Sequence, residues 1–152
     1  MLRYLFLISL FLPLTMTAQE YLGKTRAELR TELHKYTTTS GKAQILTETD
    51  STLVISPKDD AIRPVTYIYS LDKKGKCIYE KIITTCKECF EESLQLVLSK
   101  NQYEWKKINE NQYVSKYDAH VLLELPPDDN LYYLTIFPMN WTRELYELML
   151  KN

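Results

Sequence analysis

Three stretches of the chain place apolar residues at the three- to four-residue spacing of an α-helix. Two of the predicted helices cover residues 26–36 and 86–100. The third is predicted near the C-terminus, where one helical face would be formed by Trp141, Leu145, Leu148 and Met149.

Between these helices, apolar and polar residues alternate with a period of two, which is typical of half-buried strands. The clearest case is residues 65–71, followed by a turn at Asp72–Lys73–Lys74–Gly75 and a returning strand at 77–84. The other predicted strands cover residues 43–47, 52–56, 103–108, 112–116, 119–125 and 131–137.

The helix starts carry recognisable capping patterns. Thr25 with Glu28, and Thr85 with Glu88, fit the T-x-x-E capping box, in which each side chain satisfies the other residue's backbone N–H. Asn140 is the expected N-cap of the last helix. Each box opens a helix that is followed by four strands, so the order of elements suggests an αββββ pseudo-repeat with a C-terminal helix.

These patterns define the expected fold class and domain organisation. We expect one α+β domain over residues 19–152, built on an antiparallel meander sheet with helices on one face. A chain of this length buries a substantial core without needing disulfides.

Residues 1–18 have the layout of a secretory signal peptide. Arg3 supplies the positive charge, an apolar run follows, and Ala18 precedes a polar start at Gln19. The alternative, an uncleaved anchor, needs about 20 apolar residues, whereas this run is shorter and contains Pro13. We therefore expect a periplasmic or secreted protein. The first cysteine is Cys77, so no cysteine is placed for lipid attachment at the cleavage site.

Composition excludes several functional classes. Nineteen Lys and Arg residues balance 20 Asp and Glu residues, which argues against nucleic-acid binding. No second long apolar segment is present, so no membrane span is expected after cleavage. The chain has three glycines and no phosphate-binding loop, EF-hand or H-E-x-x-H motif. We therefore expect no cofactor, no metal site and no enzymatic constellation.

Cys86 and Cys89 form a C-x-x-C motif at a predicted strand-to-helix junction. A helix N-terminus favours the thiolate form of a cysteine, so this pair is a candidate redox site. A structural disulfide and a pair of free thiols are the alternatives. Together with Cys77, three single pairings are open. Cys77 is expected to be a buried free thiol on the strand face that carries Tyr79 and Ile83.

Aromatic residues supply the candidate binding residues. Tyr67, Tyr69, Tyr132 and Tyr133 lie on predicted strands, where they would form a binding face. Alternatively, they fill the space between helix and sheet.

Residues 22–29, LGKTRAEL, resemble the helix-opening segment of small periplasmic proteins of the BamE/SmpA type. The doubled helix-plus-meander plan also resembles the tandem modules of beta-lactamase-inhibitor-like proteins. Both resemblances imply a non-enzymatic protein that binds another protein or a cell-envelope component. The chain lacks the lipoprotein cysteine of the first family. The alternative function is that of a thiol–disulfide redox protein using Cys86 and Cys89.

Overall fold

The computed structural model describes residues 21–39, 44–57, 64–128 and 130–151. The predicted signal peptide, residues 1–18, lies outside this part of the chain. The described helices are α1 (Arg26–Thr39), α2 (Lys87–Leu98) and α3 (Arg143–Met149), with a short 3-10 helix, η1, at Tyr117–Ala119. The described strands are β1 (Gln44–Glu48), β2 (Thr52–Pro57), β3 (Val65–Leu71), β4 (Cys77–Thr84), β5 (Lys106–Asn109), β6 (Gln112–Val114), β7 (Val121–Glu124) and β8 (Tyr133–Pro138).

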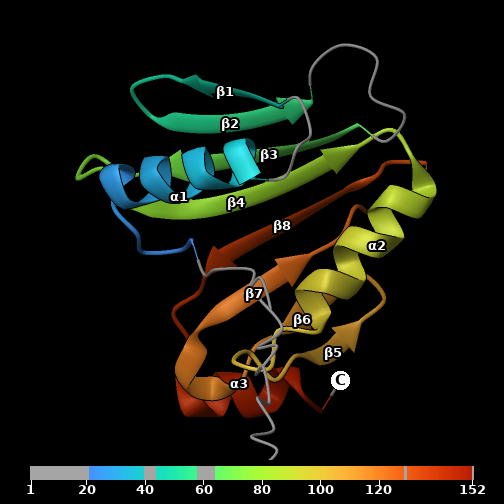
Figure 1. The fold of residues 1–152 in the computed structure, drawn as a ribbon. Coiled ribbons are helices and arrows are strands. Elements are labelled where there is room, and N and C mark those ends of the chain that lie inside the picture. Colours follow the sequence, from blue (N-terminus) through green and yellow to red (C-terminus); the bar gives the residue numbers. More distant parts are fainter. Residues whose placement is uncertain (1–20, 40–43, 58–63, 129, 152) are drawn as a thin grey trace, which may run out of the picture.

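These strands form one eight-stranded antiparallel sheet in the order β1-β2-β3-β4-β8-β7-β6-β5 (Figure 1). Each half of the chain is a helix followed by a four-stranded meander. The last strands of the two halves, β4 and β8, pair at the centre, with Ile82 opposite Leu134. The α+β fold class, the order of elements and the C-terminal helix predicted from the sequence are therefore confirmed.

Helices α1 and α2 lie on the same side of the sheet (Figure 1). Leu29 and Leu33 of α1 pack on the buried residues Leu53 and Tyr69 of β2 and β3. In the second half, Val97 of α2 belongs to a separate core cluster. The sheet and loop residues buried with it are Ile82, Tyr103, Val121, Leu123, Leu134 and Ile136. We call this side of the sheet the covered face.

Helix α3 packs on the opposite side of the sheet. Leu122 lies between Val121 and Leu123 in β7, so its side chain points away from α2. It is buried in a third cluster with Val114 of β6, Trp141 and Tyr146. Only the end of this second face near β5 to β7 is covered by α3. The rest of this side, around β4 and β8, is called the open face below.

Two of the three predicted helix caps need correction. The Thr25–Glu28 box is confirmed, because the Glu28 carboxylate accepts the backbone N–H of Thr25 at 2.7 Å. The second helix is capped by Cys86, not by Thr85, since the Cys86 sulfur accepts the backbone N–H of Cys89. The last helix is capped by Thr142, not by Asn140.

The predicted strand at residues 119–125 is shorter in the structure. Strand β7 begins at Val121, after the 3-10 helix η1 and a left-handed residue, His120, with φ of 52°. Ser115 closes this loop because its backbone N–H donates to the carbonyl of Val121 at 2.9 Å, while its hydroxyl accepts the N–H of Val121 at 3.0 Å. The sequence pattern does not reveal a contact of this kind.

Candidate functional site

A hollow of about 1100 Å³ lies on the open face of the sheet. Its floor crosses four adjacent strands, β4, β8, β7 and β6. The turn between β5 and β6 and the loop after β7 form its rim, through Asn109, Asn111 and Pro127. Three strand spacings correspond to roughly 14 Å, so the hollow is broad.

A β-bulge in β4 shapes the part of the hollow that this strand forms. Ser70 of β3 pairs with Tyr79, but the next residue, Leu71, pairs with Cys77, so Ile78 is the extra residue. Cys77 consequently lies in the core beneath α1, and both Ile78 and Tyr79 line the hollow. The prediction that Cys77 shares a strand face with Tyr79 is wrong for this reason.

Aromatic side chains form much of the floor. The rings of Tyr79 and Phe137 stack with their centroids 6.3 Å apart. The Tyr79 hydroxyl lies 3.4 Å from the Thr135 hydroxyl. The Lys81 ammonium lies over the Tyr133 ring, 4.2 Å from its centroid. The floor therefore combines apolar rings with a cation and with hydroxyl groups at the ring edges.

The charged side chains Lys81 and Glu124 of the hollow differ in their interaction partners. Lys81 and Glu124 are both paired in register with Thr135, one from each side, so all three project from the same face. The Glu124 carboxylate accepts a hydrogen bond from Gln112 at 2.7 Å. Among the described residues, no carboxylate forms an ion pair with Lys81. The hollow thus holds one cation, Lys81, that forms no ion pair with a described residue, together with the carboxylates of Glu110 and Glu124.

The four predicted binding aromatics lie in different environments. Tyr133 lines the hollow. Tyr69 is 2% exposed in the core beneath α1, and burial raises the pKa of its hydroxyl well above the usual value. Tyr67 packs beside it between helix and sheet, and Tyr132 contacts Phe90 of α2, with ring centroids 6.0 Å apart. Tyr79 and Phe137, which also line the hollow, were not among the predicted residues. Alternation places each of them on one face of its strand, but it does not show which face the helices leave open.

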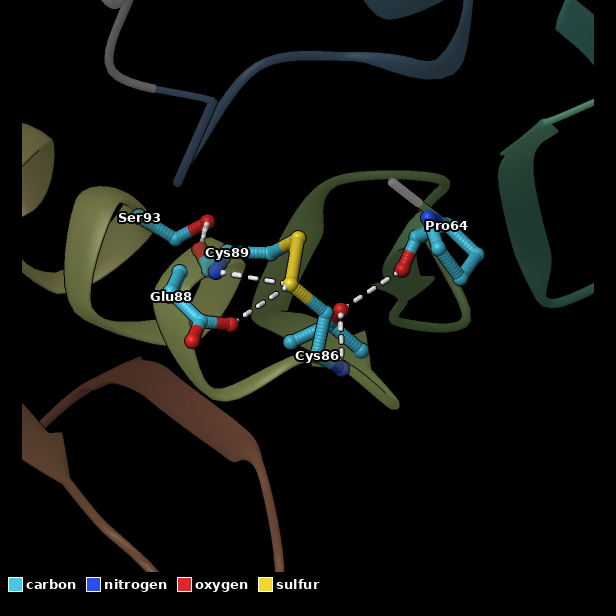
Figure 2. The surroundings of a disulfide bond; sticks show 6 residues. Pro64, Cys86, Glu88, Cys89 and Ser93 are labelled. Atoms are coloured by element: carbon cyan, nitrogen blue, oxygen red, sulfur yellow. Dashed lines mark hydrogen bonds between the residues drawn. A yellow bond between two sulfur atoms is a disulfide. The ribbon is translucent and has the colours of Figure 1, made fainter. Parts of the chain in front are cut away.

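Cys86 and Cys89 form a disulfide at the start of α2 (Figure 2). The Cys86 sulfur accepts the backbone N–H of Cys89 at 3.2 Å and lies 3.4 Å from a carboxylate oxygen of Glu88. Cys86 is partly exposed, whereas Cys89 is 2% exposed. The structure therefore selects one of the three pairings that the sequence left open.

Cys77 is buried and free, as predicted. It begins β4, whereas Cys86 follows the end of the same strand, so the two lie far apart. Burial raises the pKa of the Cys77 thiol to about 11, and the nearby Glu80 carboxylate acts in the same direction. A thiol of this kind stays protonated at neutral pH and is a poor nucleophile.

A carboxyl group lies buried on the covered face. Glu80 is paired with Tyr69 and Ile136 on its two neighbouring strands and is 4% exposed. Burial raises the pKa of Glu80, and Lys100 opposes this shift in part. Its side chain points away from the hollow, so we assign it no part in binding.

A cluster of rings surrounds His120, beside α3. Its imidazole stacks on Trp141 with centroids 5.3 Å apart and lies 5.3 Å from the Tyr117 ring. The His120 Nδ1 atom is buried without a hydrogen-bond partner. Among the described residues, no group of three or more His, Cys, Asp or Glu side chains is arranged to hold a metal ion.

No helix in the described part of the chain is long and apolar enough to cross a membrane. No protein-family model matches the chain, and no curated protein and no solved structure shows significant similarity to it. The fold and the two sites, the hollow and the disulfide, are therefore the basis for functional inference.

Proposed function

We propose that this is an exported, non-enzymatic protein that binds another protein through the open face of its sheet. The single observation that carries the proposal is the hollow of about 1100 Å³ on this face, floored by Tyr79, Tyr133 and Phe137. Aromatic side chains contribute most to binding energy at protein interfaces, since each buries a large area with few rotatable bonds.

The Lys81 ammonium favours a partner carboxylate at one point of the hollow. Lys81 lies beside Tyr133 and has no ion-pair partner among the described residues. The carboxylates of the hollow, Glu110 and Glu124, belong to the β5–β6 turn and to β7, away from β4. A partner carboxylate placed against Lys81 would form a charge-assisted hydrogen bond, while neighbouring apolar side chains contact the rings. The proposed partner is thus a protein loop with an acidic residue flanked by apolar ones.

The breadth of the site favours a protein over a small ligand. Sites for small molecules usually enclose most of the ligand surface. Here the floor is a sheet that spans four strands. A typical protein interface buries about 800 Å² on each partner, which requires a broad surface of this kind.

Two observations support the proposal that the protein is exported. The signal-like segment at residues 1–18 would direct the chain to the periplasm or out of the cell. The Cys86–Cys89 disulfide is compatible with an oxidising compartment. The weak resemblances to envelope and inhibitor-like proteins point to the same kind of role.

The test compares two lysine variants, Lys81→Ala and Lys87→Ala, in their affinity for the partner that is isolated with the wild-type protein. We expect Lys81→Ala to weaken binding by about tenfold, because it removes the cation beside Tyr133. Tyr133→Ala should have an effect of similar size. Titration calorimetry gives the dissociation constants.

Lys87→Ala is the matched control. Lys87 is an exposed lysine of α2, which packs on the other face of the sheet. Its removal changes the net charge equally and should leave the affinity unchanged. Equal weakening by Lys81→Ala and Lys87→Ala would mean that the open face is not the binding surface.

A further inference from the structure

We propose that the Cys86–Cys89 disulfide is a reversible thiol–disulfide exchange site for dithiols, with Cys86 as the sulfur that is attacked. This activity is independent of the binding proposed for the open face, because the disulfide lies at the start of α2. Three features of the disulfide and its surroundings support the inference.

The first feature is the unequal exposure of the two cysteine residues. Cys86 is partly exposed at the N-cap, whereas Cys89 is 2% exposed and lies within the first turn of α2. An incoming thiolate therefore reaches the sulfur of Cys86 in preference to that of Cys89. Access of this kind decides which sulfur of a disulfide is attacked.

The second feature is the stabilisation of the Cys86 sulfur in its reduced form. The backbone N–H of Cys89 donates to this sulfur at 3.2 Å, and the helix N-terminus adds positive potential. Both interactions favour a thiolate at Cys86. The Glu88 carboxylate, 3.4 Å away, acts in the opposite direction and disfavours negative charge there. Lys87 is exposed and pairs with Glu91, at 4.0 Å.

The third feature is a framework that holds the site without the S–S bond (Figure 2). The Cys86 N–H donates to the Thr84 hydroxyl at 3.2 Å, and that hydroxyl donates to the carbonyl of Pro64 at 2.7 Å. One turn into the helix, the Ser93 hydroxyl donates to the carbonyl of Cys89 at 2.8 Å. Reduction leaves these bonds intact, so both thiols stay in place for reoxidation.

A disulfide between residues so close in sequence adds little to stability. It closes a very short loop, and in the chain-entropy model the stabilisation by a disulfide is smallest for the shortest loops. Helix α2 is also held by its own apolar side chains, including Val97 in the core. The fold therefore does not depend on the oxidised state.

The exchange proceeds in two balanced steps. A thiolate of the dithiol attacks the Cys86 sulfur, and the electron pair of the broken S–S bond goes to Cys89, which takes up a proton. The second thiolate then attacks the dithiol's own sulfur in the mixed disulfide and releases Cys86 as a thiolate, which takes up the second proton. The dithiol loses two electrons and two protons, and the cysteine pair gains them.

The test uses the mature protein with dithiothreitol and glutathione as probes. Dithiothreitol should reduce the disulfide while circular dichroism and cooperative thermal unfolding are retained. Unfolding upon reduction would overturn the proposal and make the disulfide a structural staple.

Two variants then separate the roles of the sulfurs. With oxidised glutathione, Cys89→Ser should form a mixed disulfide at Cys86 at least about tenfold faster than Cys86→Ser does at Cys89, since access controls the rate. Peptide mapping distinguishes either product from modification at Cys77, and circular dichroism confirms that both variants are folded. Equal rates in two folded variants would contradict the assignment of Cys86 as the attacked sulfur.

Discussion

At the scale of single residues, two neighbouring charged residues of β4, Glu80 and Lys81, lie on opposite faces of the sheet. Lys81 projects into the hollow on the open face, whereas Glu80 is buried beneath the helices. A buried carboxyl group is costly when ionised, because the surrounding apolar groups cannot replace its hydration. Lys100 offsets only part of this cost, since the pKa of Glu80 remains raised.

The buried carboxyl group predicts a pH dependence of stability. The pKa of Glu80 is raised from 4.5 in the folded state, so the folded protein holds its proton more tightly than the unfolded chain does. The free energy of unfolding should therefore contain a contribution that falls as pH rises from about 4.5 to the folded-state pKa, because the unfolded state binds fewer protons in that window.

Replacing Glu80 with glutamine should remove this contribution. We expect Glu80→Gln to gain stability relative to the wild type as pH rises from 4 to 7, measured by urea unfolding at each pH. Glu110→Gln, at an exposed turn residue, is the control. Parallel pH profiles for the wild type and Glu80→Gln would contradict the account of this residue.

At the scale of elements, the periodicity of the sequence predicted the helices and hairpins that local chemistry determines. It did not predict the features that depend on contacts between distant segments. The helix at the first capping box and the hairpin at Asp72–Gly75 follow from local chemistry. Gly75 adopts a φ of 74°, and the Asp72 carboxylate accepts two backbone N–H groups of the turn.

The bulge at Ile78 and the late start of β7 depend instead on pairing with distant segments. Alternation alone carries no record of a bulge, so the sequence placed Cys77 on the same strand face as Tyr79, whereas the structure places it in the core. The same limitation applied to the aromatic candidates. Tyr69 and Tyr133 look alike as strand tyrosines, and only the position of α1 decides that Tyr69 is buried.

Helix α3 offers a test at this scale. The Tyr146 hydroxyl donates a buried hydrogen bond of 2.9 Å to the carbonyl of Ser115. Tyr146→Phe should lower the free energy of unfolding by about 1 kcal/mol, because the carbonyl loses its side-chain donor in a buried site. Urea unfolding measures the change. A variant as stable as the wild type would show that this bond does not fix α3 to the sheet.

At the scale of the whole molecule, the three α-helices of the described residues leave one broad surface of the sheet uncovered. α1 and α2 pack on the covered face, and α3 closes only one end of the opposite face. Pairing of β4 with β8 at the centre joins the two meanders into one continuous surface. The hollow lies across this junction, so neither half of the chain alone would form it.

The central claim, binding through the open face, is tested most directly by site-specific photo-crosslinking in the producing cells. A photoreactive amino acid would replace either Ile78 or Leu96, two exposed apolar residues with 44% and 63% exposure. Ile78 lines the hollow, whereas Leu96 lies on α2. We predict a discrete crosslinked protein from position 78, reduced in yield in the Lys81→Ala background, and none from position 96. The same product from both positions, or a product from position 96 alone, would contradict the proposed binding face.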